Sequence, residues 1–353
     1  MENKTGRIFY FDALRAFAIL SVVLLHVTCH LKEIMNYTAS SIHSASGAFV
    51  VLFINFFTIG VPIFLLLSGA LLLGRDWEIK DFLSKRLPRI TKPFLFWSLA
   101  FTVLLVILSL LIPSVDFVTS FGAYDILKLF WDTLMCNAPG SAVYWFFWMM
   151  FGVYLIIPIF NKWIKNSDLS ELEYFLVLWL VSIVFEYTFM MECPVKLSYF
   201  TSPIGLVVLG YYLRHTDRKI FNNAFCAVSL IIISTVLMFV YSYFIADTVS
   251  FSYHRYSMPV VIEAIGVFCS FKCILLLNNP NEWILKIITS ISVCSYGMYL
   301  IHSQLVMATR KLLHGSLGFT AEYLLLFVVG FIVSWLIIYT LSKIPVLKDF
   351  VGV

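Results

Sequence analysis

Long apolar runs separated by short polar segments dominate the pattern of hydrophobic positions along the chain. A helix needs about 20 apolar residues to cross the hydrocarbon core of a membrane, and about ten runs approach or exceed that length. The runs cover residues 9–31, 48–73, 91–112, 142–164, 172–190, 198–214, 222–246, 257–278, 284–310 and 322–344. They predict about ten transmembrane helices, of which the fifth and sixth are the most weakly defined.

The connection between the third and fourth runs, at about 113–140, differs from the others. It contains the sequence YDILKLFWDTL, in which charged and apolar residues recur at helical spacing. This pattern predicts an amphipathic helix that lies on the membrane surface.

The composition excludes a soluble globular protein. The chain is 61% hydrophobic and only 12% charged, with a mean hydropathy of +0.93, whereas soluble domains carry about 25% charged residues. No segment rich in Pro, Gly or Ser divides the chain, so we expect a single membrane domain over residues 1–353. The net charge of +4 is too small to indicate a nucleic-acid partner.

The Lys and Arg residues predict the orientation of the chain in the membrane. With the N-terminus inside, most of the 24 Lys and Arg residues fall in cytoplasmic segments. Cytoplasmic connections are enriched in Lys and Arg, so this distribution places both termini in the cytoplasm. The expected fold is therefore an all-α polytopic membrane protein with its helices around a central polar cavity.

The first apolar run carries an unusual set of polar residues. The sequence FDALRAFAILSVVLLHVTCH contains Asp12, Arg15, His26 and His30. Arg15 and His26 are separated by about three helical turns, or about 16 Å, and therefore share one face. Asp12 lies within ion-pair reach of Arg15. Aligned ionisable groups are typical of a helix that lines a cavity; alternatively, Arg15 reaches the headgroups and His26 bonds a neighbouring helix.

Several passages in this order resemble the membrane acyltransferase-3 family. The first is Arg15-x10-His26, and it is followed by VPIFLLLSGALLL at 61–73, KRLPRI at 85–90 and YWFFWMMFGVYLIIPIF at 144–160. IGLVVLGYYL and SVCSYGMYLIH resemble later spans of the family. Many relatives have Gly-Val-Asp where this chain has Gly-Val-Pro at 60–62, a variant that is similar to the branch of the enterobacterial common-antigen O-acetyltransferase.

The resemblance implies an O-acyltransferase of the bacterial cytoplasmic membrane. Its donor would be acetyl-coenzyme A or another acyl-coenzyme A, without a metal, and its acceptor a hydroxyl of a glycan or lipid-linked sugar. A neutral imidazole, with an ordinary pKa near 6.5, can remove the proton of such a hydroxyl, so we assign His26 as the general base. Arg15 would bind the pyrophosphate of the donor, and Asp12 would orient Arg15.

The basic residues of the KRLPRI passage are candidates for binding the nucleotide end of the donor. Arg86 and Arg89 are three residues apart and share a helical face, and Lys85 and Lys92 add positive charge. Arginine grips phosphate oxygens with a planar fork. The alternative is simple anchoring at the cytoplasmic surface. Pro88, between the arginines, is expected in the first turn of its helix.

Residues of the ninth run and of the outer ends of other runs are candidates for contacting the acceptor. Ser295, Tyr299 and His302 share one helical face and could bond the thioester or the acceptor, or simply join neighbouring helices. Tyr144 and Trp145 could stack on a sugar ring or belong to an interfacial aromatic belt.

Three further polar residues complete the set of candidates. Glu263 is a candidate acid within its span. His254 and Arg255 lie in a predicted outer loop and could touch the acceptor.

Two other classes of function remain open at the level of sequence. A proton-coupled transporter of a small solute or a polysaccharide precursor also uses intramembrane His, Arg and Glu, but its usual pair of broken spans is missing. A membrane scaffold would not need the alignment of Arg15 and His26. A metal-dependent hydrolase is disfavoured because HExxH is absent and the two histidines of the first run lack a third ligand.

Overall fold

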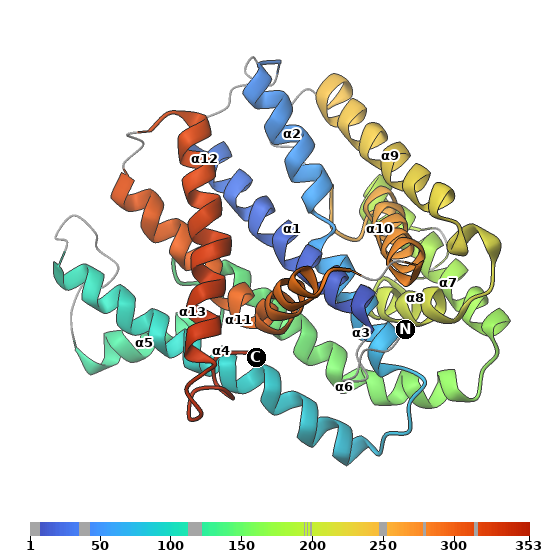
Figure 1. Cartoon of the computed structure of the whole chain (residues 1–353), viewed down its shortest axis with the longest axis horizontal. Coiled ribbons are helices and arrows are strands. Elements are labelled where there is room, and N and C mark those ends of the chain that lie inside the picture. Colours follow the sequence, from blue (N-terminus) through green and yellow to red (C-terminus); the bar gives the residue numbers. More distant parts are fainter. Residues whose placement is uncertain are drawn as a thin grey trace. The chain divides into compact units, whose positions relative to one another are not determined.

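The computed structural model describes residues 8–34, 43–111, 122–193, 195, 197, 200–246, 253–277, 280–313 and 317–353, with the backbone alone for 32–34, 111, 276 and 277. Within these residues the chain is helical and has no β-strand (Figure 1). The helices are α1 Phe9–Ile34, α2 Ala45–Phe57, α3 Gly60–Leu72, α4 Ile79–Leu111, α5 Ala123–Leu134, α6 Trp145–Lys165, α7 Leu169–Ile183, α8 Ile204–His215, α9 Ala224–Val240, α10 Met258–Leu277, α11 Glu282–Leu313, α12 Phe319–Phe327 and α13 Ser334–Leu341.

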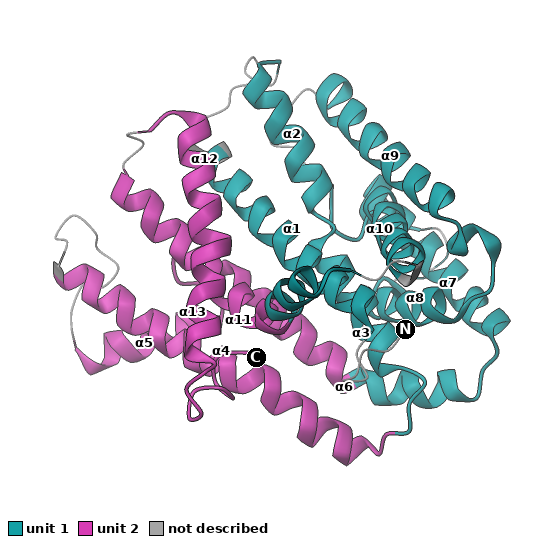
Figure 2. Ribbon diagram, in the orientation of Figure 1, with its two compact units in different colours: residues 1–76, 156–292 teal, residues 77–155, 293–353 magenta. Residues whose placement is uncertain are grey.

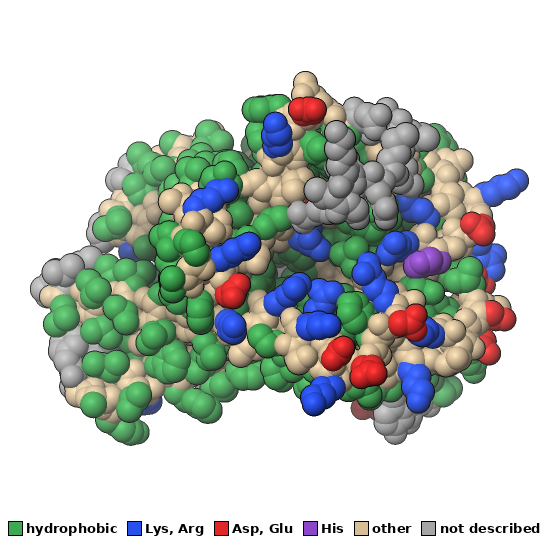
Figure 3. All heavy atoms as spheres, turned by 60° about the horizontal axis from the view of Figure 1, so that its bottom comes forward, with side chains coloured by type: hydrophobic (Ala, Val, Ile, Leu, Met, Phe, Trp, Pro, Cys, Tyr) green, Lys and Arg blue, Asp and Glu red, His purple; other side chains and the backbone are tan. Residues whose placement is uncertain are grey.

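Nine helical stretches of the described chain are long and apolar enough to cross a membrane. One combines α2 and α3, and others continue through π-helical turns, such as Val328–Val333 between α12 and α13. Hydrophobic side chains also cover much of the surface in Figure 3, as lipid-facing helices require. The predicted class, an all-α polytopic membrane protein, is confirmed; the cytoplasmic position of the termini stays a prediction.

The chain divides into two compact units, which are coloured separately in Figure 2. Unit 1 comprises Met1–Asp76 and Ile156–Ser292, and unit 2 comprises Trp77–Leu155 and Val293–Val353. Of the three boundaries, one falls between α3 and α4 and the other two fall within α6 and α11. The expectation of a single membrane domain stays a prediction.

The predicted sixth span, 198–214, is wrong as a complete membrane-crossing helix. α8 has 12 residues and is about 18 Å long, which is shorter than the hydrocarbon core of about 30 Å. It lies beside α7 in unit 1: the Trp179 ring meets Gly205, and the Tyr212 hydroxyl donates a hydrogen bond of 2.6 Å to Glu173.

The backbones of α3 and α8 approach each other closely at two glycines. A Cβ atom on Gly69 would lie 1.6 Å from the carbonyl oxygen of Val207, and one on Gly210 would lie 1.9 Å from that of Leu66. Small residues permit such contacts between membrane helices, where packing rather than hydrophobic burial drives association. Both positions therefore require glycine.

In unit 2, α4 begins earlier than the hydrophobic pattern predicts. The helix starts at Ile79 rather than near residue 91, so Pro88 lies well inside it and not in its first turn. An interior proline cannot donate to the carbonyl four residues before it. Further along α4, Phe94 stacks on Phe147 of α6 at 3.8 Å between ring centroids.

The helix α5 confirms a helix in the predicted amphipathic segment at about 113–140. Residues 113–121 of that segment lie outside the described part. Leu129 packs against Phe101 and Leu105 of α4, all within unit 2. On the other side, the side chains of Tyr124, Leu127 and Trp131 are exposed. This distribution fits a helix with one packed face; its position on the membrane surface stays a prediction.

Residues 342–353 fold back onto α4 and α11 in unit 2. Val351 is fully buried, and its carbonyl oxygen accepts a hydrogen bond of 3.3 Å from Trp97 Nε1. The amide of Gly297 donates to the carbonyl of Gly352 at 3.2 Å. Gly352 has a φ of +90°, and a Cβ atom on Gly297 would lie 2.2 Å from the Val351 oxygen. Glycine at 297 and 352 thus makes this packing possible.

Candidate active site

The polar residues of the first span lie together on α1, as predicted. The Asp12 carboxylate and the Arg15 guanidinium are 3.9 Å apart at their closest atoms. Asp12 is buried, whereas the Arg15 side chain is 29% exposed. The expected ion-pair distance is confirmed, and it joins a buried carboxylate to a partly exposed guanidinium.

A residue that the sequence analysis did not single out joins this pair. Ser292, on α11 in unit 1, donates a hydrogen bond of 2.7 Å to Asp12 Oδ1. Arg15 Nη1 donates in turn to Ser292 Oγ at 3.4 Å. Ser292 begins the passage SVCSYGMYLIH and lies three residues before Ser295 on the same helix. That spacing is the only sign of it in the sequence.

His26 lies further along α1 and is half-buried. The helix is continuous from Phe9 to Ile34, so Arg15 and His26 share a face at a separation of about 16 Å along the axis. The flanking Val22, Val23 and Val27 are buried. His26 therefore emerges from a packed face of α1 with part of its surface accessible.

The basic residues of α4 lie on the helical segment before the apolar part of the span. Lys85 and Arg89 are exposed and Arg86 is half-buried. Lys85 pairs with Asp81 at 3.7 Å. The Arg86 guanidinium lies 5.5 Å from the centre of the Trp77 ring, and Lys92 lies 5.7 Å from that of Phe350. All four cations are at least partly accessible at the surface of unit 2.

The candidate residues of α11 are buried inside unit 2. Ser295 is 3% exposed, Tyr299 2% and His302 fully buried. The Tyr299 hydroxyl donates to the Val143 carbonyl at 2.9 Å, and His302 Nδ1 lies 2.8 Å from the Tyr299 carbonyl. The hydrogen bond of Tyr299 joins α11 to the segment before α6. This contact fits the alternative that Tyr299 joins neighbouring helices.

The two aromatic candidates at the start of α6 differ in exposure. Tyr144 is 1% exposed and meets Phe94 edge-on at 5.4 Å between ring centroids. Trp145 is half-buried. Trp145 is therefore the more accessible of the two rings.

Glu263 lies in the interior of unit 1. It is fully buried on α10, and the Thr235 hydroxyl of α9 lies 2.5 Å from its Oε1 atom. The same hydroxyl lies 2.8 Å from the Ile231 carbonyl. The Oε2 atom has no hydrogen-bond partner among the described residues. Glu263 thus belongs to the contact between α9 and α10.

His254 precedes α10 and stacks on Tyr187, with 4.3 Å between ring centroids and 11° between the planes. Burial, with a smaller contribution from the charge of Arg255, lowers the pKa of His254 from 6.5 to about 4. The imidazole is therefore neutral at physiological pH, and its ring serves as a packing surface.

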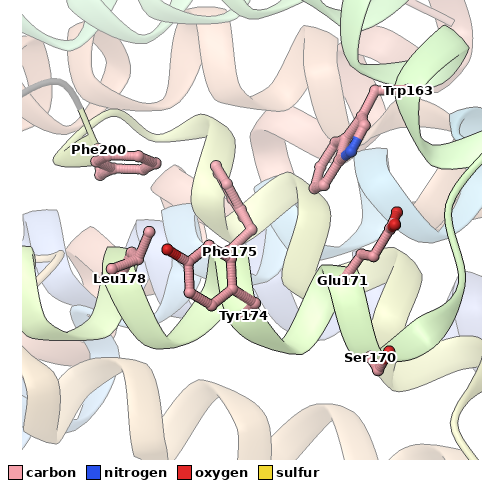
Figure 4. Close-up of a pocket in the computed structure, with 7 residues that line it drawn as sticks. All are labelled: Trp163, Ser170, Glu171, Tyr174, Phe175, Leu178 and Phe200. Atoms are coloured by element: carbon pink, nitrogen blue, oxygen red, sulfur yellow. The ribbon is translucent and has the colours of Figure 1, made fainter.

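A pocket of about 610 Å³ opens elsewhere in unit 1, between the end of α6 and α7. Figure 4 shows its lining residues, Trp163, Ser170, Glu171, Tyr174, Phe175, Leu178 and Phe200. None of them belongs to the predicted site. Within the described ranges, no group of three or more His, Cys, Asp and Glu residues is arranged to hold a metal ion.

The structure thus brings Asp12, Arg15 and Ser292 together in unit 1, while Tyr144, Ser295, Tyr299 and His302 lie in unit 2. A family model described as an acyltransferase domain matches residues 8–339, nearly the whole chain. The comparisons with curated proteins and with solved structures return no match. The chain belongs to the acyltransferase-3 family and is a multi-pass membrane acyltransferase.

Proposed function

We propose that this protein transfers an acyl group, acetyl in the simplest case, from cytoplasmic acyl-coenzyme A to a hydroxyl of a cell-surface glycan or a lipid-linked sugar. The bacterial cytoplasmic membrane is its expected location. The observation that carries the proposal is the polar arrangement of α1, in which Asp12 and Ser292 contact Arg15 on the same helix as His26.

His26 is the general base of the proposed reaction. Its neutral imidazole removes the proton of the acceptor hydroxyl while the hydroxyl oxygen attacks the thioester carbonyl. The carbon–sulfur bond then breaks, and the departing thiolate takes the proton from the imidazolium. The products are the acyl ester and free coenzyme A, with no net change in protons. A positioned base of this kind contributes about 10²–10⁴-fold to the rate.

Arg15 is the proposed partner of the pyrophosphate of the donor. Its guanidinium is partly exposed, and Asp12 and Ser292 restrict its orientation. The separation of about 16 Å from His26 is comparable to the length of an extended pantetheine arm. Arg86, Arg89, Lys85 and Lys92 would hold the nucleotide end, which their surface position on α4 permits.

The candidate acceptor-binding residues differ in the solvent exposure of their side chains. Trp145 is half-buried and offers the most accessible ring for a sugar. Tyr144, Ser295, Tyr299, His302 and Glu263 are buried, so contact with the acceptor would require their surroundings to open.

The test is acyl transfer by a His26→Ala variant. Membrane vesicles from cells that express the chain receive radiolabelled acetyl-coenzyme A, and label is counted in the glycan and lipid fractions. We expect the variant to lose transfer by about 10²–10⁴-fold, while acetyl-coenzyme A still raises the unfolding temperature of the purified protein. His30→Ala, one helical turn further along α1, is the matched control. Transfer at the wild-type rate in His26→Ala would contradict the proposed base.

A further inference from the structure

Two cations of unit 1 that have no part in the proposed mechanism lie at the C-terminal end of α8. Lys272 of α10 is 9% exposed, and its ammonium donates to the Leu213 carbonyl at 2.8 Å. Arg214 is half-buried and donates to the Ala70 carbonyl of α3 at 2.5 Å. Its guanidinium carbon lies 5.3 Å from the centre of the Phe11 ring. The site therefore joins α1, α3, α8 and α10.

The two positive charges act on the same small region. Leu213, which accepts from Lys272, directly precedes Arg214 in the chain. Burial lowers the pKa of His215, and the charges of Arg214 and Lys272 lower it further. Both cations thus lie within electrostatic range of one imidazole.

The two cations donate to carbonyls near the C-terminal ends of helices, which explains their position. These neutral carbonyls do not neutralise the two positive charges. Ala70 and Leu213 are among the last residues of α3 and α8, whose terminal carbonyls lack helical partners and attract cations. Each cap uses one donor, whereas lysine has three and arginine has five.

Neither cation pairs with a carboxylate within the described part of the chain. Asp217 is close enough to influence Lys272 electrostatically but forms no ion pair with it. By contrast, the exposed Arg218 makes a bidentate pair with Glu173 at 2.6 and 2.5 Å. Buried charges are normally paired, because desolvation without compensation is costly.

We propose that Arg214 and Lys272 form a binding site for a phosphate group. The guanidinium offers a planar fork for two phosphate oxygens, and the ammonium adds a compact charge. Two sources supply this chemistry, the phosphates of the acyl-coenzyme A donor and the headgroup of an anionic lipid. With the first source the site extends the proposed function, but the binding itself does not depend on His26 or on the acceptor.

The experiment measures binding to the purified full-length protein. Radiolabelled pyrophosphate, coenzyme A, and nanodiscs with phosphatidylglycerol or phosphatidylcholine are compared as probes, with binding and unfolding temperature as readouts. Arg214→Gln and Lys272→Gln should each weaken phosphate binding at least tenfold. Arg218→Gln, which removes a paired cation four residues away from Arg214, should bind like wild type.

Each outcome has a defined meaning. Binding of pyrophosphate and coenzyme A that Arg214→Gln and Lys272→Gln weaken identifies a coenzyme phosphate at this site, and phosphatidylglycerol binding alone that the same variants weaken identifies a lipid headgroup. If Arg214→Gln or Lys272→Gln fails to fold, Arg214→Lys and Lys272→Arg keep the charge and should retain binding with altered affinity. The proposal is overturned if no probe binds the wild type, or if folded Gln variants bind as well as Arg218→Gln. His26→Ala should bind normally, which separates this result from the catalytic proposal.

Discussion

At the scale of single residues, Ser292 is the group whose removal tests the arrangement around Arg15 most directly. Its hydroxyl donates to Asp12 and accepts from Arg15. A hydrogen bond to a charged group contributes about 1.5–3 kcal/mol, which corresponds to about 10–150-fold in an equilibrium constant. We expect Ser292→Ala to raise KM for acyl-coenzyme A within that range, with a smaller effect on kcat, in steady-state assays of transfer.

Two further variants separate positioning from simple loss of stability. Ser292→Thr keeps the hydroxyl and should restore most of the KM. Ser21→Ala removes a buried hydroxyl of α1 that donates to the Phe17 carbonyl of its own helix at 2.9 Å, and should leave KM unchanged. An unaltered KM in Ser292→Ala would show that the serine does not position Arg15.

His254 predicts a dependence of stability on pH. Its pKa is about 4 in the folded protein and about 6.5 in an unfolded chain. Between these values the unfolded chain binds more protons, so the free energy of unfolding falls as pH decreases from 6.5 to 4. His254→Phe keeps the ring on Tyr187 and removes the titration, and should therefore flatten this part of the curve. Unfolding temperatures of both proteins from pH 7.5 to 4.5 measure the difference; identical slopes would refute the assignment.

At the scale of helices, the contact between α3 and α8 is the most sensitive to added volume. The methyl group of Gly69→Ala would overlap the Val207 carbonyl, so the helices must separate. Overpacking costs about 1–3 kcal/mol, and we expect a lower unfolding temperature and poorer recovery of monodisperse protein in detergent.

Gly152→Ala is the matched control for this prediction. Gly152 also lies within a helix, α6, but nothing lies within 4 Å of an added Cβ. Alanine is favoured over glycine in helices by about 1 kcal/mol, so this variant should be neutral or stabilising. Equal effects of the two substitutions would show that the close contact between α3 and α8 does not limit stability.

Comparison of the observed helices with the hydrophobic pattern shows what the pattern can predict and where it fails. Long apolar runs predicted the nine long helical stretches because each must satisfy its backbone inside lipid. The pattern missed the first turns of α4, since the helix from Ile79 continues through charged residues. It overestimated α8, whose apolar residues are buried in unit 1 rather than in a complete crossing.

At the scale of the whole molecule, the ion pair between Arg218 and Glu173 bears on topology. Glu173 lies near the start of α7, and Arg218 precedes α9. These two helices therefore begin close together, and the chain between them must return to the side from which α7 started. α8 is too short to cross the membrane by itself, so we expect the whole segment between α7 and α9 to make this return. Together with the nine long stretches of the described chain, that segment would give ten crossings, an even number.

An even number of crossings predicts both termini on one side, and the basic residues place that side in the cytoplasm. Green fluorescent protein fused to either end should fluoresce, and alkaline phosphatase fused there should be inactive. Fusions within the segment before α5 should give the opposite pattern. An active phosphatase at one terminus only would indicate an odd number of crossings.

The candidate site could be predicted only where its members lie on one helix. Periodicity along α1 was sufficient to align Asp12, Arg15 and His26. Ser292 lies 280 residues from Asp12 in the chain, and Arg214 and Lys272 are carried by α8 and α10. Contacts between helices depend on how the helices pack. The spacing of residues within a single span cannot predict this packing.

The packing of Val351 affects how this protein should be shortened for study. Similarity to the family ends at residue 339, yet Val351 is fully buried against Trp97 and Gly297, twelve residues beyond that limit. A chain cut at residue 339 would lose a folded edge of unit 2 and uncover the indole that it shields. Truncation designed from family boundaries would therefore damage the enzyme, whereas an affinity tag placed after the exposed Val353 leaves this packing intact.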